Sequence, residues 1–94
     1  MVYVVIEHKI GQMAEFERIF RDDSERRGKM GSMGGRVMID TKDPDILFVI
    51  FEWADKERAT KFAESFRTHE AVKCASSGIW YRIAVVEDLF QIKS

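Results

Sequence analysis

The sequence is poor in the residues that mark secreted, metal-binding or membrane-spanning proteins. Among 94 residues there is a single cysteine, Cys74, which excludes an internal disulfide and any cysteine-rich metal site. We therefore expect a cytoplasmic protein without a bound metal. The longest apolar run, Ile46 to Phe51, is far too short to span a membrane. The apolar start of the chain is followed at once by Glu7, His8 and Lys9, so we expect no signal peptide.

The chain also lacks a linker and an excess of either charge. There is one proline, Pro44, and no repeat or tract rich in glycine and serine, so residues 1–94 are expected to form a single domain. Lys and Arg number 15 against 16 Asp and Glu, which predicts no general attraction to nucleic acid or to an anionic membrane. Hydrophobic residues make up 46%, a content that excludes a disordered chain.

The first third of the chain predicts a strand followed by a helix. Val2 to Ile10 is rich in β-branched residues and predicts a strand that ends before Gly11. From Gln12 to Arg27 apolar residues recur at helical spacing among charged ones, which predicts one helix ending at Gly28. The apolar stripe of this helix consists of Met13, Phe16, Ile19 and Phe20.

A loop and a hairpin are predicted next. Gly28 to Gly35 holds four of the six glycines and predicts a loop. Arg36 to Thr41 and Ile46 to Trp53 predict two strands. Between them, Lys42 to Asp45 contains an aspartate and a proline that both favour a turn. These two strands should therefore pair as a hairpin.

The last third predicts a second helix and a final strand. The side chain of Asp55 is suited to cap the helix, because a carboxylate accepts hydrogen bonds from the free amides of the first turn. A further helical piece is predicted from about Thr68 to Ala75, and a last strand from Ile79 to Glu87. The apolar stripe of the second helix consists of Ala59, Phe62, Ala63 and Phe66.

The element order β-α-β-β-α-β predicts an α+β, ferredoxin-like fold with a four-stranded antiparallel sheet. Right-handed crossovers place both helices on one face of this sheet. The other face should then be polar at alternate positions, yet Val4 to Ile6, Ile46 to Phe51 and Ile83 to Val86 are apolar on both sides. Because a large apolar face is rarely left exposed, we expect a homodimer that packs through the helix-free sheet face.

The same residues resemble a known family along nearly the whole chain. The first strand ends in Glu7-His8-Lys9, and Asp43-Pro44 precedes an apolar strand that ends in Phe51-Glu52-Trp53-Ala54-Asp55. Helical positions Ala59, Phe62 and Ser65 follow. This arrangement resembles the small dimeric α+β barrel proteins, specifically the antibiotic biosynthesis monooxygenase-like group. The resemblance implies a homodimeric α+β barrel in which each subunit keeps a pocket between its helices and its sheet.

The resemblance also implies a range of activities and two site positions. Members include cofactor-independent oxygenases of aromatic compounds, haem-degrading enzymes and proteins of unknown activity. A polar residue late in the first strand and an aromatic residue on the second helix line the pocket, and these positions match His8 and Phe62. Haem-degrading members and some oxygenases carry Asn and Trp there. Their haem-binding histidine would fall near Val72, one turn after His69, which counts against haem here.

His8 is the candidate catalytic residue. It follows Val4 and Ile6 on one face of the first strand, so it would lie at the end of an apolar pocket if that face meets the helices. Histidine titrates near neutral pH and suits a proton shuttle. The alternative is a strand-end histidine that is hydrogen-bonded to a carbonyl group or to water.

The candidate substrate-binding residues are aromatic or basic. They would form a pocket for a planar compound, although aromatic residues also dominate ordinary cores. Arg82 interrupts an apolar strand and would bind a ligand oxygen or pair with Glu7 or Glu52. His69 would lie at the pocket mouth or on the surface of a helix. The full set is Trp53, Phe62, Phe66, His69, Trp80 and Arg82.

Two functions remain open from the sequence. The first is a cofactor-independent monooxygenase-like enzyme that acts on a small apolar or aromatic compound. The second is a non-catalytic barrel that binds a small ligand or has a structural role, and haem degradation is a third and less favoured reading. An open cavity beside His8 would favour the enzyme, whereas a space filled by side chains would favour the binding protein.

Overall fold

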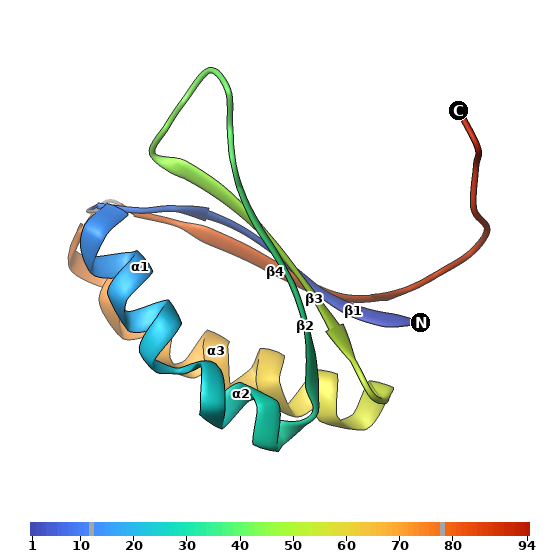
Figure 1. The fold of residues 1–94 in the computed structure, drawn as a ribbon. Helices are drawn as coiled ribbons and strands as arrows, with labels where there is room; N and C mark the ends of the chain where they lie inside the picture. The colour runs from blue at the N-terminus through green and yellow to red at the C-terminus, as the bar shows by residue number, and fades with distance from the viewer. Residues whose placement is uncertain (12, 78) are drawn as a thin grey trace.

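The computed structural model describes residues 1–11, 13–77 and 79–94, without the side chains of residues 15, 19 and 69–77. Figure 1 shows one layer of strands with all the helices on one side of it. The predicted order of elements is confirmed, except that the first helix is divided in two. The elements are β1 (Val2–Lys9), α1 (Met13–Asp22), α2 (Ser24–Met30), β2 (Ser32–Ile39), β3 (Ile46–Trp53), α3 (Lys56–Ser77) and β4 (Tyr81–Glu87).

The strands form one antiparallel sheet in the order β2-β3-β1-β4, so β1 and β3 are central and β2 and β4 are edges. The register places Ile6 opposite both Val49 and Ile83. Burial alternates along β1 and β3, because successive side chains point to opposite faces and only one face meets the helices. The buried core consists of Val4, Ile6, Val49, Phe51, Trp53, Ala59, Phe62, Ala63 and Ile83.

The prediction of one helix from 12 to 27 and a loop from 28 to 35 was wrong. The helix breaks at Asp23, and α2 continues through Gly28 to Met30. A glycine within a helix costs only about 1 kcal/mol, which the surrounding structure outweighs here. The actual end is Gly31, whose φ of 112° lies in the left-handed region that favours glycine, and its N–H donates to the carbonyl of Gly28.

Strand β2 therefore begins earlier than predicted and contains an irregularity. The pairing of β2 with β3 shifts register between Ser32 and Gly35. At Gly35 the two backbones approach so closely that a Cβ atom would overlap the carbonyl oxygen of Ile50. The predicted hairpin of β2 and β3 is confirmed, and the glycine-rich segment contributes half of its first strand.

Helix α3 is one continuous helix that includes the separately predicted piece from 68 to 75. The described residues of α3 include no glycine or proline, the residues that most often end a helix. The predicted cap is confirmed, since the Asp55 carboxylate accepts from the Arg58 N–H at 2.8 Å. Ala59, Phe62 and Ala63 are buried against the sheet.

The helix-free face of the sheet is apolar in its middle and charged towards its ends. Val5, Phe48 and Ile50 lie on this face and are half-buried. Glu7 and Arg82 stand opposite each other beside them. The face is therefore less uniformly apolar than the sequence suggested, and its apolar part is a central band.

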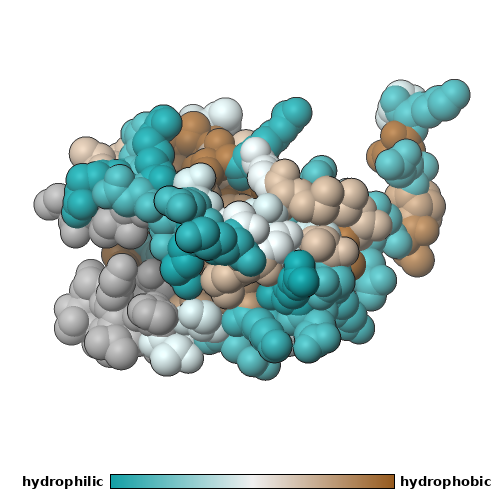
Figure 2. Space-filling model, turned by 60° about the horizontal axis from the view of Figure 1, so that its bottom comes forward, coloured by the Kyte–Doolittle hydropathy of each residue, from teal (hydrophilic) through white to brown (hydrophobic). Residues whose placement is uncertain are grey.

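After β4 the chain leaves the body of the domain as an extended tail (Figure 1). Leu89 is 91% exposed, and Phe90 and Ile92 are similarly open to solvent. Figure 2 shows this segment projecting with apolar side chains on it. Within the described residues, no helix is both long and apolar enough to cross a membrane.

Candidate functional site

His8 lies at the end of β1 and is enclosed on the helix-covered face. Its side chain is only 4% exposed, and its Nδ1 lies 3.0 Å from the backbone oxygen of Trp80. A carbonyl oxygen can only accept, so Nδ1 carries the hydrogen and donates. The same oxygen accepts from the backbone N–H of Lys9. The structure thus gives His8 the carbonyl bond considered among the sequence alternatives.

Aromatic rings surround the imidazole of His8. The ring of Phe16 and the ring of Phe66 each meet it edge-on at 6.1 Å between centroids, and Tyr81 lies at 6.2 Å. These three rings lie around the imidazole, which is itself buried.

The rings continue as a closed circle under the helices, which we call the aromatic circle. From Phe16 it passes to Phe20 at 5.6 Å, and from there to Phe51 at 5.6 Å. It returns through Phe62 at 5.5 Å and Phe66 at 6.3 Å. Such contacts add about 0.5–1.5 kcal/mol per pair beyond burial. The circle consists of His8, Phe16, Phe20, Phe51, Phe62 and Phe66.

The structure brings together some of the predicted site residues and separates others. Trp53 is 1% exposed and its ring lies 5.0 Å from that of Phe62, so both belong to the core beside the aromatic circle. The indole Nε1 of Trp53 is buried and has no hydrogen-bond partner among the described residues. Trp80 is 39% exposed and reaches His8 through its backbone oxygen.

The basic candidates do not join His8. Arg82 is exposed and lies on the helix-free face opposite Glu7, while His8 points to the other face. Within the part of the chain that the structure describes, Arg82 forms no ion pair with Glu7 or Glu52. The side chain of His69 lies outside the described residues.

A groove of about 450 Å³ runs between α1 and the β2–β3 hairpin. Phe16 and Phe20 of the aromatic circle form one wall, and Val37 and Ile39 of the edge strand β2 form the other. The volume falls within the range of roughly 300–1,000 Å³ that is usual for ligand pockets. The groove is lined by Met13, Phe16, Glu17, Phe20, Arg21, Val37, Met38, Ile39 and Leu47.

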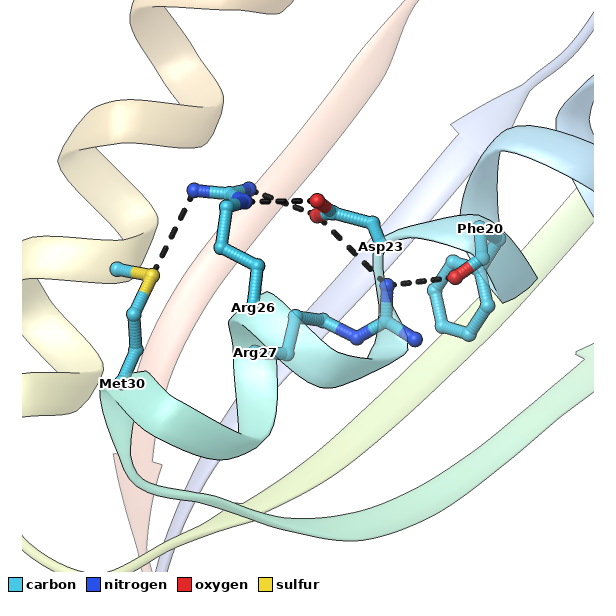
Figure 3. Close-up of polar contacts among 5 residues, drawn as sticks. All are labelled: Phe20, Asp23, Arg26, Arg27 and Met30. Carbon is cyan, nitrogen blue, oxygen red and sulfur yellow. Dashed lines mark hydrogen bonds and ion pairs between the residues drawn. The ribbon is translucent and has the colours of Figure 1, made fainter.

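A smaller cavity of about 240 Å³ adjoins the groove and shares Phe20 and Val37 with it. Its wall includes Arg27, which is only 8% exposed. The guanidinium lies over the ring of Phe20, 4.0 Å from the centroid, and donates to the Phe20 backbone oxygen at 2.7 Å. Figure 3 shows Arg27 between Phe20 and Asp23.

Burial lowers the pKa of the Arg27 guanidinium from its ordinary value, and Asp23 partly opposes this effect. Asp23 lies 3.8 Å from Arg27 but is engaged more closely by Arg26, at 2.7 Å through each carboxylate oxygen. These hydrogen bonds to Asp23 raise the pKa of Arg26. Arg27 still carries its positive charge at neutral pH, because arginine is not deprotonated in proteins.

The sequence reading missed the groove and Arg27 for identifiable reasons. The groove lies between α1 and Val37 to Ile39, which are far apart in the sequence, and the smaller cavity uses Ser32, Gly34 and Gly35 from a segment predicted to be a loop. Residues 22–27 carry charges of both signs, a pattern typical of a solvated helix end. The available signal was spacing: Arg27 follows Phe20 by seven residues and so continues the apolar stripe of Phe16 and Phe20.

Over the described residues, no group of three or more His, Cys, Asp or Glu side chains is placed to hold a metal ion. The polar groups at the groove and the smaller cavity are instead arginines, serines and one Glu17–Arg21 pair at 2.7 Å. This set suits hydrogen bonding to an organic ligand with oxygen atoms.

No protein-family model matches the chain, and neither does any curated protein sequence. Solved structures do match it. A provisionally named antibiotic biosynthesis monooxygenase from Deinococcus radiodurans superposes with a TM-score of 0.69 at 15% identity, over 100% of this chain and 98% of that one.

Two further structures match over nearly their whole length. A mutant of MhuD with two manganese protoporphyrin IX molecules per active site matches with a TM-score of 0.64 at 16% identity, over 100% of both chains. A dimeric ferredoxin-like protein from an uncultured marine organism matches at 0.52 and 15% identity, over 97% of this chain and 98% of that one. The chain therefore has the same fold as solved structures named antibiotic biosynthesis monooxygenases, which is the fold that its sequence resemblance implied.

Proposed function

We propose that this protein binds a small apolar or aromatic compound in the groove between α1 and the β2–β3 hairpin, as a monooxygenase-like α+β barrel protein. One observation carries the proposal: a groove of about 450 Å³ whose wall is formed by the stacked rings of Phe16 and Phe20. Stacked aromatic side chains favour a planar apolar ligand. Structures with the same fold are named antibiotic biosynthesis monooxygenases, which supports the monooxygenase-like part of the proposal.

Binding is tested by thermal shift with a panel of naphthols. A ligand that binds only the folded state raises the melting temperature. Val37→Trp should fill the groove and abolish the shift, because Val37 lines it and is 44% exposed. Val86→Trp is the matched control, a 38% exposed valine on the other edge strand that should leave the shift unchanged. Equal shifts in both variants would place the ligand elsewhere.

An oxidoreductase activity is the finer part of the proposal, with His8 as the group that moves a proton. His8 touches the Phe16 ring, which also lines the groove, so a ligand would reach the imidazole where Phe16 turns aside. His8→Asn can keep a donor to the Trp80 oxygen but cannot act as a base at neutral pH. We expect it to bind naphthols and to lose oxygen consumption, whereas equal inertness of wild type and variant would defeat the enzyme proposal.

A non-catalytic ligand-binding protein is the second candidate. The three rings that close around His8 at about 6 Å favour it. Saturable naphthol binding without oxygen consumption, in wild type and in His8→Asn alike, would select this candidate.

Haem is the least favoured ligand. In the described part of the chain no histidine lines the groove, since His8 is enclosed and bound to the Trp80 oxygen. The position that the resemblance assigns to a haem-binding histidine, Val72, lies outside the described side chains. A haemin titration should give no shift of the Soret band. A saturable shift would instead support haem as the ligand.

We further propose that two copies pair through the central apolar band of the helix-free face, around Val5, Phe48 and Ile50. The half-buried state of these side chains and the register that brings them together support such pairing. The dimeric ferredoxin-like neighbour is a relevant precedent. The single cysteine supports a reducing compartment, and we propose the cytoplasm.

A further inference from the structure

The smaller cavity beside the groove has a different chemical character from the groove itself. The groove is walled largely by apolar side chains, whereas the wall of the cavity includes Ser24, Ser32 and the cation Arg27. No acidic side chain belongs to the cavity wall that the structure describes. The two spaces have Phe20 and Val37 in common in their walls and therefore lie side by side.

The charge of Arg27 is buried and only partly compensated. Its Nη1 donates to the Phe20 oxygen at 2.7 Å, and the Asp23 carboxylate is 3.8 Å away. Asp23 receives two shorter hydrogen bonds of 2.7 Å from Arg26, so Arg27 shares this carboxylate with a second arginine (Figure 3). Arg27 therefore retains a positive charge that a ligand can neutralise.

Hydrogen-bond donors of Arg27 also remain available. A guanidinium has five N–H groups in a planar fork. Among described residues, only Nη1 of Arg27 finds an acceptor, which leaves Nε and the second terminal nitrogen. A planar fork with adjacent free donors matches a carboxylate, which can accept two parallel hydrogen bonds.

We propose that Arg27 anchors the acidic group of an aromatic carboxylate whose ring lies in the adjoining groove against Phe16 and Phe20. This inference rests on the proposed function and narrows its ligand class from apolar aromatics to aromatic monoanions. Ser24 and Ser32 supply further hydroxyl groups at the same end. The ligand is amphipathic, with an apolar body and one charged end.

The test compares 2-naphthoate with its neutral isostere 2-naphthamide by calorimetry at pH 7. We expect wild type to bind naphthoate at least about tenfold more tightly than the amide, because hydrogen bonds to charged groups are the stronger ones. Arg27→Met should weaken naphthoate binding by at least about tenfold and change amide binding by less than about twofold. Retained amide binding shows that the variant is folded.

Arg18→Met is the matched control, since Arg18 is an exposed arginine of α1 paired with Asp22 at 3.6 Å and belongs to the described wall of neither the groove nor the smaller cavity. It should change naphthoate affinity by less than about twofold. If Arg27→Met does not fold, Arg27→Lys replaces it. Lysine keeps the positive charge but lacks the planar guanidinium, so its affinity for naphthoate should lie between those expected for wild type and Arg27→Met. Equal affinities of wild type for naphthoate and the amide would contradict the role of Arg27 as the carboxylate anchor, but not the proposed binding of an aromatic compound in the groove. Binding of neither compound would overturn both.

Discussion

Individual glycines in this chain have opposite roles that stability measurements can separate. Gly35→Ala should destabilise the fold by about 1–3 kcal/mol, because the new Cβ would overlap the Ile50 carbonyl oxygen and push β2 from β3. Gly28→Ala is the control: no atom lies within 4 Å of its Cβ position, and alanine should stabilise α2 by up to about 1 kcal/mol. Urea unfolding measures both. A harmless Gly35→Ala would contradict the close pairing of the two strands.

The turn before β3 gives a prediction about acid stability. The backbone N–H groups of Lys42 and Asp43 donate to the Asp40 carboxylate at 2.7 and 3.0 Å and lower the pKa of Asp40 below its ordinary value of 3.8. A lowered pKa in the folded state adds stability that is complete above 3.8 and is lost as pH falls through the lowered value. Asp40→Asn should lose stability at pH 6 and show a weaker decline below pH 4. Unchanged acid dependence in unfolding curves would count against these hydrogen bonds.

For Arg27, the sequence shows the position on the helix, whereas the environment of the side chain depends on the tertiary structure. Its spacing from Phe20 is visible in the sequence, but mixed charge around it favoured a solvated surface. Whether an arginine snorkels to water or folds back over a ring depends on the tertiary packing. His8 was identified correctly as the polar end of an apolar strand face, whereas its enclosure by Phe16, Phe66 and Tyr81 depends on long-range contacts.

At the scale of elements, helix α3 depends on a local start signal. The Asp55 carboxylate accepts from the Arg58 N–H at 2.8 Å, so Asp55→Ala should lower the free energy of unfolding by about 1 kcal/mol. Asp45→Ala removes an equally exposed carboxylate that caps nothing and should change stability by less than about 0.5 kcal/mol. Thermal unfolding of the two variants checks the difference. Equal melting temperatures would show that the cap contributes nothing.

Strands and helices with a strong hydrophobic periodicity were predictable. Whether a glycine ends an element or lies within it was not. The hairpin, the order of elements and the cap of α3 were all predicted from local patterns. The segment from 28 to 35 was not, because glycine permits both helix and strand and only the neighbours decide between them. Gly28 stays helical, while Gly35 enters the sheet where β3 leaves no room for a side chain. The smaller cavity was missed for the same reason, since Ser32, Gly34 and Gly35 belong to its wall.

At the scale of the whole molecule, the helix-free face predicts association. Wild type should run at twice its chain mass of 11.0 kDa in light scattering at micromolar concentration. Ile50→Lys places a charge in the central apolar band and should shift the protein towards a single chain. Lys61→Gln, on the exposed surface of α3, should leave the mass unchanged. A monomeric wild type would contradict the proposed pairing.

The most direct test of the groove as the binding site is methyl NMR of the wild-type protein titrated with 2-naphthol. The predicted result is a saturable change in the signals of Val37, Ile39 and Leu47, which line the groove. The signals of Val5 and Ile50 on the opposite face of the sheet should stay in place. Changes confined to that opposite face, or no change at saturating naphthol, would contradict the proposed site.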